Sequence, residues 1–119
     1  IDDVAAVAIS LATLLQSEDI SAVPLDGGRK ALEMLEAGEQ PAGMVLDLGM
    51  PDVGGNALLS RLIKVPEWTF PVVVLTGDED SLERRLRGRV SVVLRKPVEP
   101  NDLLAAVRQA LGYRVGYKP

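Results

Sequence analysis

The sequence contains neither cysteine nor histidine, and each absence excludes whole classes of chemistry. Without cysteine the chain has no disulfide, no thiolate zinc site and no cysteine nucleophile. Without histidine it has no imidazole for acid–base catalysis or metal ligation, and a Ser-His-Asp triad is excluded. Any catalytic or metal site must therefore be built from carboxylates, hydroxyls, amides, backbone carbonyls and cationic side chains.

Aromatic residues make up only 3% of the chain, and no apolar run reaches the roughly 18 residues that span a bilayer. Because no signal peptide opens the chain either, we expect a cytoplasmic protein whose domain makes no membrane contact. The formal net charge of −4 gives no basic footprint, so we expect no nucleic-acid contact by this domain. With 47% hydrophobic and 25% charged residues, the 119-residue chain has the composition of one globular domain.

Short β-branched runs alternate with helical patterns, which is typical of an α/β fold around a parallel sheet. The predicted strands cover 20–25, 43–46, 71–75 and 90–94, and the predicted helices cover 4–16, 29–37, 56–63, 81–87 and 101–111. Asn56 and Asn101 are expected to cap their helices. A βα unit needs about four or five more residues ahead of Ile1, so we expect a first strand that lies largely upstream. The domain is expected to span 1–111, with 112–119 as a tail or the start of a linker.

Polar residues end the expected strands, where functional groups gather in open parallel sheets. Asp2 and Asp3 follow the upstream strand, while Asp47, Thr76 and Lys96 end three later ones. Converging carboxylates repel unless a cation joins them, and oxygen-only ligands suit Mg²⁺. A lysine and a hydroxyl can bind phosphoryl oxygens. The residues therefore indicate a Mg²⁺-dependent phosphoryl site with a carboxylate nucleophile.

Each of these residues also has an ordinary structural interpretation. Asp2 and Asp3 can cap the first helix, and Asp47 can start an Asx-turn. Thr76 can be a turn residue before a glycine, and Lys96 a solvated surface lysine. Their joint occurrence at successive strand ends favours the site.

The chain resembles the receiver domains of two-component response regulators, such as the chemotaxis regulators, from Ile1 to about Leu111. The matching pieces are Asp2-Asp3, the string DLGMPDVGG over 47–55, Thr76-Gly77 and Lys96-Pro97. The resemblance implies a doubly wound, flavodoxin-like (βα)5 fold with a parallel sheet of order 2-1-3-4-5. It also implies a phosphoprotein of signal transduction that switches its partner interactions when an aspartate is phosphorylated.

The resemblance assigns the phosphorylation to Asp47, which would take a phosphoryl group from a phosphohistidine of a histidine kinase or histidine phosphotransfer domain. Asp3 and Asp47 would ligate Mg²⁺ directly, Asp2 through water, and Gly49 through its backbone carbonyl.

Three further roles follow from the same resemblance. Thr76 would hydrogen-bond a phosphoryl oxygen once Asp47 is modified, and Lys96 would pair with Asp47 before that step and with the phosphoryl group after it. The peptide bond before Pro97 is expected to be cis.

The sequence departs from the family at the position three residues before Lys96. Most receivers carry an aromatic residue there whose rotation accompanies the threonine movement, whereas this chain has Val93. The region before it is short and carries four arginines within 84–89, which form either a solvated basic face or a modified dimer or effector surface.

The first helix is unusually apolar, and we expect four of its residues to lie partly outside the core: Ala5, Ala6, Ile9 and Ala12. Loose packing explains such a face, and so does docking of the helical hairpin that carries the donor histidine.

Other functions remain alternatives. A degenerate receiver would act only as an interaction module, and a small Mg²⁺-dependent phosphohydrolase would also use an aspartyl phosphate. Such hydrolases carry a second aspartate two residues after the nucleophile, where this chain has Gly49. A flavin-binding relative is disfavoured because no Ser/Thr-rich phosphate loop is present. We therefore expect a signalling domain that catalyses only its own phosphoryl transfer and dephosphorylation. A fused kinase, as in a hybrid sensor histidine kinase, and a homodimer are left open.

Overall fold

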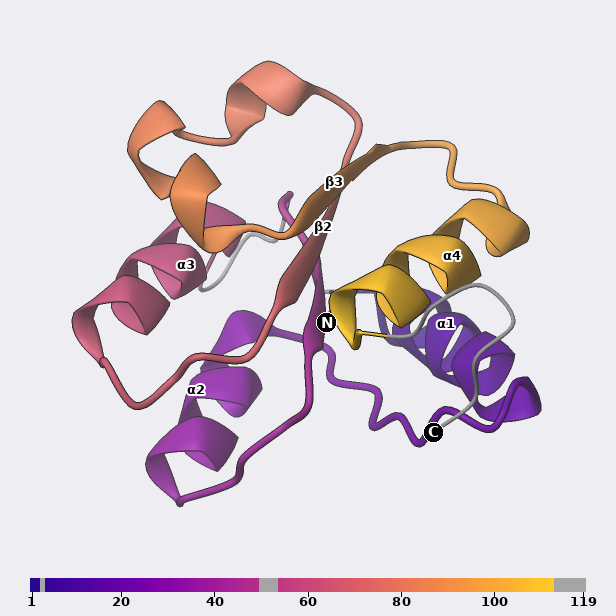
Figure 1. Ribbon diagram of the computed structural model, residues 1–119, viewed down its shortest axis with the longest axis horizontal. Helices are drawn as coiled ribbons and strands as arrows, with labels where there is room; N and C mark the ends of the chain where they lie inside the picture. Colours follow the sequence, from indigo (N-terminus) through magenta and orange to yellow (C-terminus); the bar gives the residue numbers. More distant parts are fainter. Residues whose placement is uncertain (3, 50–53, 113–119) are drawn as a thin grey trace.

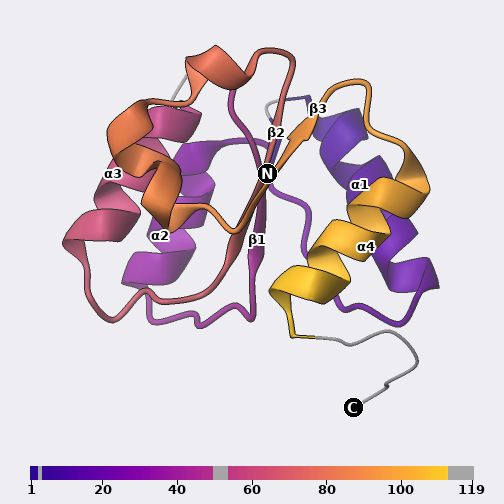
Figure 2. The ribbon, with the colours of Figure 1, turned by 45° about the horizontal axis from the view of Figure 1, so that its top comes forward.

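A computed structural model describes residues 1–2, 4–49 and 54–112, and every structural statement below concerns these residues. The helices are α1 (Ala5–Ser17), α2 (Gly28–Glu36), α3 (Gly55–Lys64) and α4 (Pro100–Ala110), the 3-10 helices are η1 (Glu79–Ser81) and η2 (Arg84–Arg89), and the strands are β1 (Met44–Asp47), β2 (Val72–Thr76) and β3 (Val92–Arg95). The sheet lies between two helical layers, with α1 and α4 on one face and α2 and α3 on the other (Figures 1 and 2). No described helix combines the length and apolar character that a membrane crossing needs.

The strands that the structure describes are parallel and lie in the order β1-β2-β3. All five residues of the central strand β2 are buried, as its uninterrupted apolar run predicts for a strand covered on both faces. Its side chains alternate: Val74 packs with the α2 and α3 layer, and Val73 packs with α4. Because the strands are parallel, Asp47, Thr76 and Arg95 end them at the same edge of the sheet.

Ile1 and Asp2 lie between Leu25 and β1. The Asp2 N–H donates to the Leu25 carbonyl at 3.0 Å, and the Asp47 N–H donates to the Ile1 carbonyl at 2.9 Å. The Ile1 amino group donates to the Val45 carbonyl. The segments therefore follow one another across the sheet in the expected order 2-1-3-4-5, with Leu25 and then Ile1–Asp2 ahead of β1.

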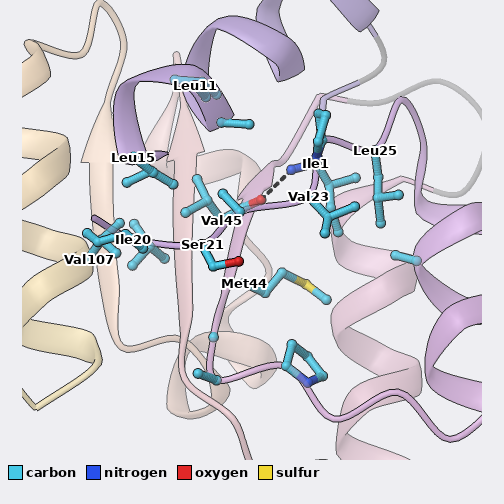
Figure 3. A pocket seen from close by; sticks show the side chains of 18 of the residues that line it. Ile1, Leu11, Leu15, Ile20, Ser21, Val23, Leu25, Met44, Val45 and Val107 are labelled. Atoms are coloured by element: carbon cyan, nitrogen blue, oxygen red, sulfur yellow. Dashed lines mark hydrogen bonds between the residues drawn. The ribbon is translucent and has the colours of Figure 1, made fainter. Parts of the chain in front are cut away.

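The predicted strand over 20–25 is wrong, because these residues form no strand. A strand needs a neighbouring strand along its length, whereas the hydrogen bonds that this segment makes with described residues are isolated ones, to Asp2 at Leu25 and to α1 at Ile20 and Ala22. The segment instead borders a mostly apolar trough of about 480 Å³ between α1, β1 and α4 (Figure 3). The residues that line the trough include Leu11, Leu15, Ile20, Val45 and Val107.

The predicted α-helix over 81–87 is also wrong, since the chain forms the two 3-10 helices η1 and η2 there. A run of this length is too short to offset the cost of nucleating an α-helix by itself. Tertiary contacts decide its conformation instead: Leu82 and Leu86 are almost fully buried in the core beside α3.

Two details of the helices differ from expectation. The N-caps of α3 and α4 are Gly54 and Glu99, so Asn56 and Asn101 lie inside these helices. In α1 the expected exposure holds for Ala6 and Ile9, but Ala12 is buried at 5% exposure, so the expectation is wrong for this residue. The tail over 113–119 lies outside the described residues.

Candidate functional site

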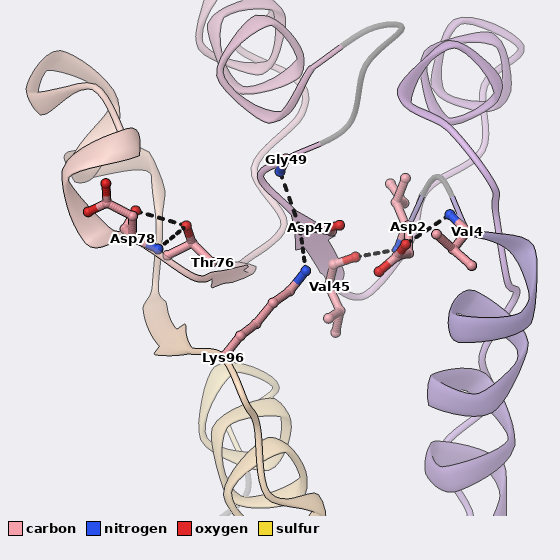
Figure 4. A network of polar contacts seen from close by, with 9 residues as sticks. Asp2, Val4, Val45, Asp47, Gly49, Thr76, Asp78 and Lys96 are labelled. Carbon is pink, nitrogen blue, oxygen red and sulfur yellow. Dashed lines mark hydrogen bonds and ion pairs between the residues drawn. The ribbon is translucent and has the colours of Figure 1, made fainter.

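Asp47 stands at the carboxyl end of β1 and is nearly buried, with 6% of its surface exposed. The buried residues Met44 and Leu46 anchor the strand, so the backbone delivers this side chain to the edge of the sheet. The Lys96 ammonium donates to Asp47 Oδ1 at 2.8 Å, and the Gly49 N–H donates to the same oxygen at 3.2 Å (Figure 4). The structure therefore holds one carboxylate oxygen of Asp47 by an ion pair and a backbone amide.

Asp2 is a second buried carboxylate near this edge, with 3% of its surface exposed. Its Oδ1 accepts the Val4 N–H at 2.9 Å, a turn-type contact just before α1. The Asp47 N–H donates at 2.9 Å to the carbonyl of Ile1, the residue before Asp2, so Asp2 follows directly after a residue that is hydrogen-bonded to the end of β1. Asp3 lies outside the described residues.

Thr76 ends β2 beside Asp47 and is buried, at 4% exposure. Its hydroxyl donates to the Asp78 carbonyl at 2.9 Å and accepts the Asp78 N–H at 3.1 Å. The Thr76 hydroxyl is thus hydrogen-bonded within the loop that follows β2, which is the structural role that a threonine before a glycine can have in a turn.

Lys96 follows the end of β3 and its N–H donates to the Thr76 carbonyl at 2.8 Å, which continues the pairing of β2 with β3 by one residue. The peptide bond between Lys96 and Pro97 is cis. The Lys96 side chain is 42% exposed, so the ion pair joins a buried carboxylate to a half-exposed ammonium.

The donor set suits a hard divalent cation. Asp2 and Asp47 offer buried carboxylate oxygens, and Gly49, two residues after Asp47, is exposed. The Lys96 ammonium and the Gly49 N–H both donate to Oδ1 of Asp47. No described residue donates to Oδ2. No group of three acidic side chains forms among the described residues, which exclude Asp3. Two carboxylates and a carbonyl with room for water are the ligands that Mg²⁺ prefers.

Val93 is half-buried in β3 and packs against the core on the α2 and α3 side of the sheet. It lies opposite Val74, two residues before Thr76 along β2. The position predicted for a rotating aromatic is therefore filled by a small side chain at the edge of the core.

Asn56 has a role that the sequence did not predict. The Asn56 side-chain amide donates to the Ser81 carbonyl at 2.7 Å, and its oxygen accepts the Glu83 N–H at 3.1 Å. Asn56 thereby ties the start of α3 to the link between η1 and η2. An asparagine just after a glycine-rich loop is typical of an N-cap, so no local signal distinguishes this long-range contact.

Comparisons with known proteins agree with this geometry. The profile of the response regulator receiver domain matches residues 1–108. The regulatory protein VanRc of Enterococcus gallinarum is 31% identical over 113 residues, which are 93% of this chain and 48% of VanRc, so the chain spans about half of that relative.

Solved structures give the same result. A response regulator receiver protein from Burkholderia phymatum is 29% identical with a TM-score of 0.79, covering 96% of this chain and 93% of that one. The receiver domain of a signal transduction histidine kinase from Syntrophus aciditrophicus is 26% identical with a TM-score of 0.83, covering 94% and 86%. The doubly wound parallel fold is thereby confirmed, and the chain belongs to the response regulator receiver domain family of two-component systems.

Proposed function

We propose that the domain accepts a phosphoryl group on Asp47 from a phosphohistidine of a histidine kinase or histidine phosphotransfer domain. The observation that carries this proposal is the placement of Asp47: it is a nearly buried carboxylate at a strand end, and Lys96 and Gly49 hold one of its oxygens. This arrangement orients a carboxylate for attack and leaves its second oxygen without a described donor.

In the proposed step a carboxylate oxygen of Asp47 attacks the phosphorus atom. The bond between phosphorus and the imidazole nitrogen breaks, the imidazole leaves with the electron pair and takes up a proton, and an acyl phosphate remains on Asp47. The Lys96 ammonium, now 2.8 Å from Oδ1, is placed to compensate the charge of the added group.

Mg²⁺ is the cation that this site would hold, through Asp3, Asp47 and the Gly49 carbonyl, with Asp2 acting through water. When bound, the ion would neutralise negative charge between the carboxylates and the phosphoryl oxygens. The support comes from the buried oxygens of Asp2 and Asp47, which are hard ligands, and from the absence of histidine and cysteine in the chain.

The proposed switch starts at Thr76. Its hydroxyl must give up its contacts with Asp78 before it can bond a phosphoryl oxygen, so phosphorylation would rearrange the loop that follows β2. Val93 cannot report this movement by rotating a ring. Partners would then read the position of the loop and of η1 directly.

The similar proteins differ in kind: VanRc is a regulatory protein, and the Syntrophus domain belongs to a histidine kinase. We further propose that the domain works in the cytoplasm, that it can belong to a hybrid sensor kinase, and that it can form a homodimer. A degenerate receiver that only binds partners is the alternative, favoured by the valine at position 93.

The deciding experiment is intact-mass spectrometry after treatment with acetyl phosphate, with and without Mg²⁺, on the wild type and on Asp47→Asn. We expect a gain of one phosphoryl group that needs Mg²⁺ and is absent from the variant. A phosphorylated histidine donor is tested in parallel. If the wild type gains nothing from either donor, the phosphoacceptor proposal is wrong and the interaction module takes its place.

A further inference from the structure

A hollow of about 670 Å³ opens at the end of the molecule opposite Asp47, where the chain enters β2 and β3. It is bordered by the end of α3, by the turn that leads to β2, and by η2. The lining residues include Leu62, Ile63, Val65, Trp68, Phe70, Arg85, Arg89 and Val90. Phe70 and Trp68 are both of the aromatic residues that the structure describes, so the aromatic surface of the described chain is concentrated here.

The charged side chains that line this hollow are both basic. They are Arg85 and Arg89, and no aspartate or glutamate is among the lining residues, although acidic residues outnumber basic ones 17 to 13 in the chain. From Arg84 to Val98 the sequence contains no acidic residue at all. The lining of the hollow is therefore basic in a molecule whose net charge is −4.

Arg89 is the residue that distinguishes this hollow from an ordinary basic surface. Its guanidinium lies over the Phe70 ring, 5.2 Å from the centroid, and its Nη2 donates to the Trp68 carbonyl at 3.1 Å. Burial lowers the pKa of Arg89. No carboxylate of the described chain pairs with it. Arg85, in contrast, pairs with Glu83 at 2.8 Å, and both of these side chains are exposed.

We propose that the hollow binds an acidic segment of a partner protein, with a carboxylate on the Arg89 guanidinium and an adjoining apolar side chain against Trp68 and Ile63. A guanidinium fixed over a ring and to a backbone carbonyl presents its remaining N–H groups in a fixed fork, which matches a carboxylate. Partial burial strengthens such a contact because water competes less for the same groups. Ile63 is a large apolar side chain with 47% of its surface exposed, which gives the neighbouring residue of the segment an apolar contact.

The site is independent of the phosphoacceptor. It lies at the amino-terminal ends of the strands, whereas Asp47 lies at a carboxyl-terminal end, so the two can be occupied together. Asp47→Asn should bind the segment as the wild type does, and a failure of the phosphorylation experiment leaves this proposal unaffected.

The test is an NMR titration of the ¹⁵N-labelled protein with the peptide Ac-Asp-Leu-Asp-Leu-NH2 and with its neutral counterpart Ac-Asn-Leu-Asn-Leu-NH2. We expect saturable shifts for the amides over 62–70 and 85–91 with the acidic peptide. Loss of one charge-assisted contact should weaken binding at least about tenfold for the neutral peptide. Equal binding of the two peptides, or no saturable shift with the acidic one, overturns the proposal.

Three variants complete the test. Arg89→Gln should weaken binding of the acidic peptide at least about tenfold. Arg84→Gln removes an exposed arginine outside the lining and should bind the peptide like the wild type. Arg89→Lys keeps the positive charge but loses the forked N–H groups, so its affinity for the acidic peptide should lie between those of Arg89→Gln and the wild type. If Arg89→Gln loses the spectral dispersion of a folded protein, the affinity of Arg89→Lys decides the question. If Arg84→Gln and Arg89→Gln weakened binding of the acidic peptide equally, net charge alone would explain the effect and the proposed site would be wrong.

Discussion

At the scale of single residues, Lys96 is the cation that contacts Asp47 among the described residues. Because its side chain is 42% exposed, Lys96→Ala should change the free energy of unfolding by only about 1 kcal/mol or less. The effect should fall on signalling instead: Asp47 still gains a phosphoryl group, but the accompanying change in amide exchange over 76–83 shrinks. Lys64→Ala, at an exposed position of α3, is the control. An undiminished exchange response in Lys96→Ala would contradict the role of this lysine.

Gly55 makes a different residue-scale prediction, because a Cβ there would lie 2.7 Å from both Cα and Cδ1 of Leu48. The close approach packs the start of α3 against the residue that follows Asp47. Gly55→Ala should therefore lower the free energy of unfolding by about 1–3 kcal/mol, measured by urea denaturation. Gly77→Ala meets no atom within 4 Å and should stay within about 0.5 kcal/mol of the wild type. Equal stability of the two variants would show that Leu48 moves aside freely.

At the scale of elements, the ends of β1, β2 and β3 were predictable because each is an apolar run that finishes at a polar residue, although only β1 and β2 are largely buried. The site residues at these ends followed from the same pattern. The segment between Thr76 and β3 was not predictable, since its conformation depends on burial of Leu82 and on the Asn56 side chain, which lies 25 residues from Ser81 in the sequence. Local periodicity carries no information about such a contact.

The Asn56 contacts give the element-scale prediction. Both hydrogen bonds are exposed, so Asn56→Ala should cost about 1 kcal/mol of stability and speed amide exchange at Glu83. Asn56→Asp retains an acceptor for the Glu83 N–H but loses the donor to Ser81, and its Glu83 amide should exchange more slowly than in the alanine variant. Hydrogen exchange followed by NMR measures both. Indistinguishable exchange at Glu83 in the wild type and the alanine variant would mean that η1 and η2 hold their link without Asn56.

At the scale of the whole molecule, each helical layer packs on its own face of the sheet. The α2 and α3 layer joins η2 in one continuous core, whereas α1 and α4 form a second apolar cluster with the sheet around Leu15, Val73 and Leu103. The prediction of the strand over 20–25 failed because a sequence pattern reports which residues suit a strand and says nothing of the neighbouring strand that it needs. The parallel α/β class was predictable from the alternation of elements, whereas the doubly wound order followed from the resemblance to receiver domains.

This second cluster makes a prediction about how stability is distributed. Leu11 is half-buried at its edge, whereas Leu103 is 1% exposed between α4 and the sheet. Removing a fully packed leucine costs its transfer energy and leaves a cavity, so Leu103→Ala should lose about 3 kcal/mol in urea denaturation. Leu11→Ala removes a side chain that is already partly in solvent, and should lose about 1 kcal/mol because less apolar surface and less cavity are involved. Equal losses would mean that Leu11 is packed as tightly as Leu103 in solution.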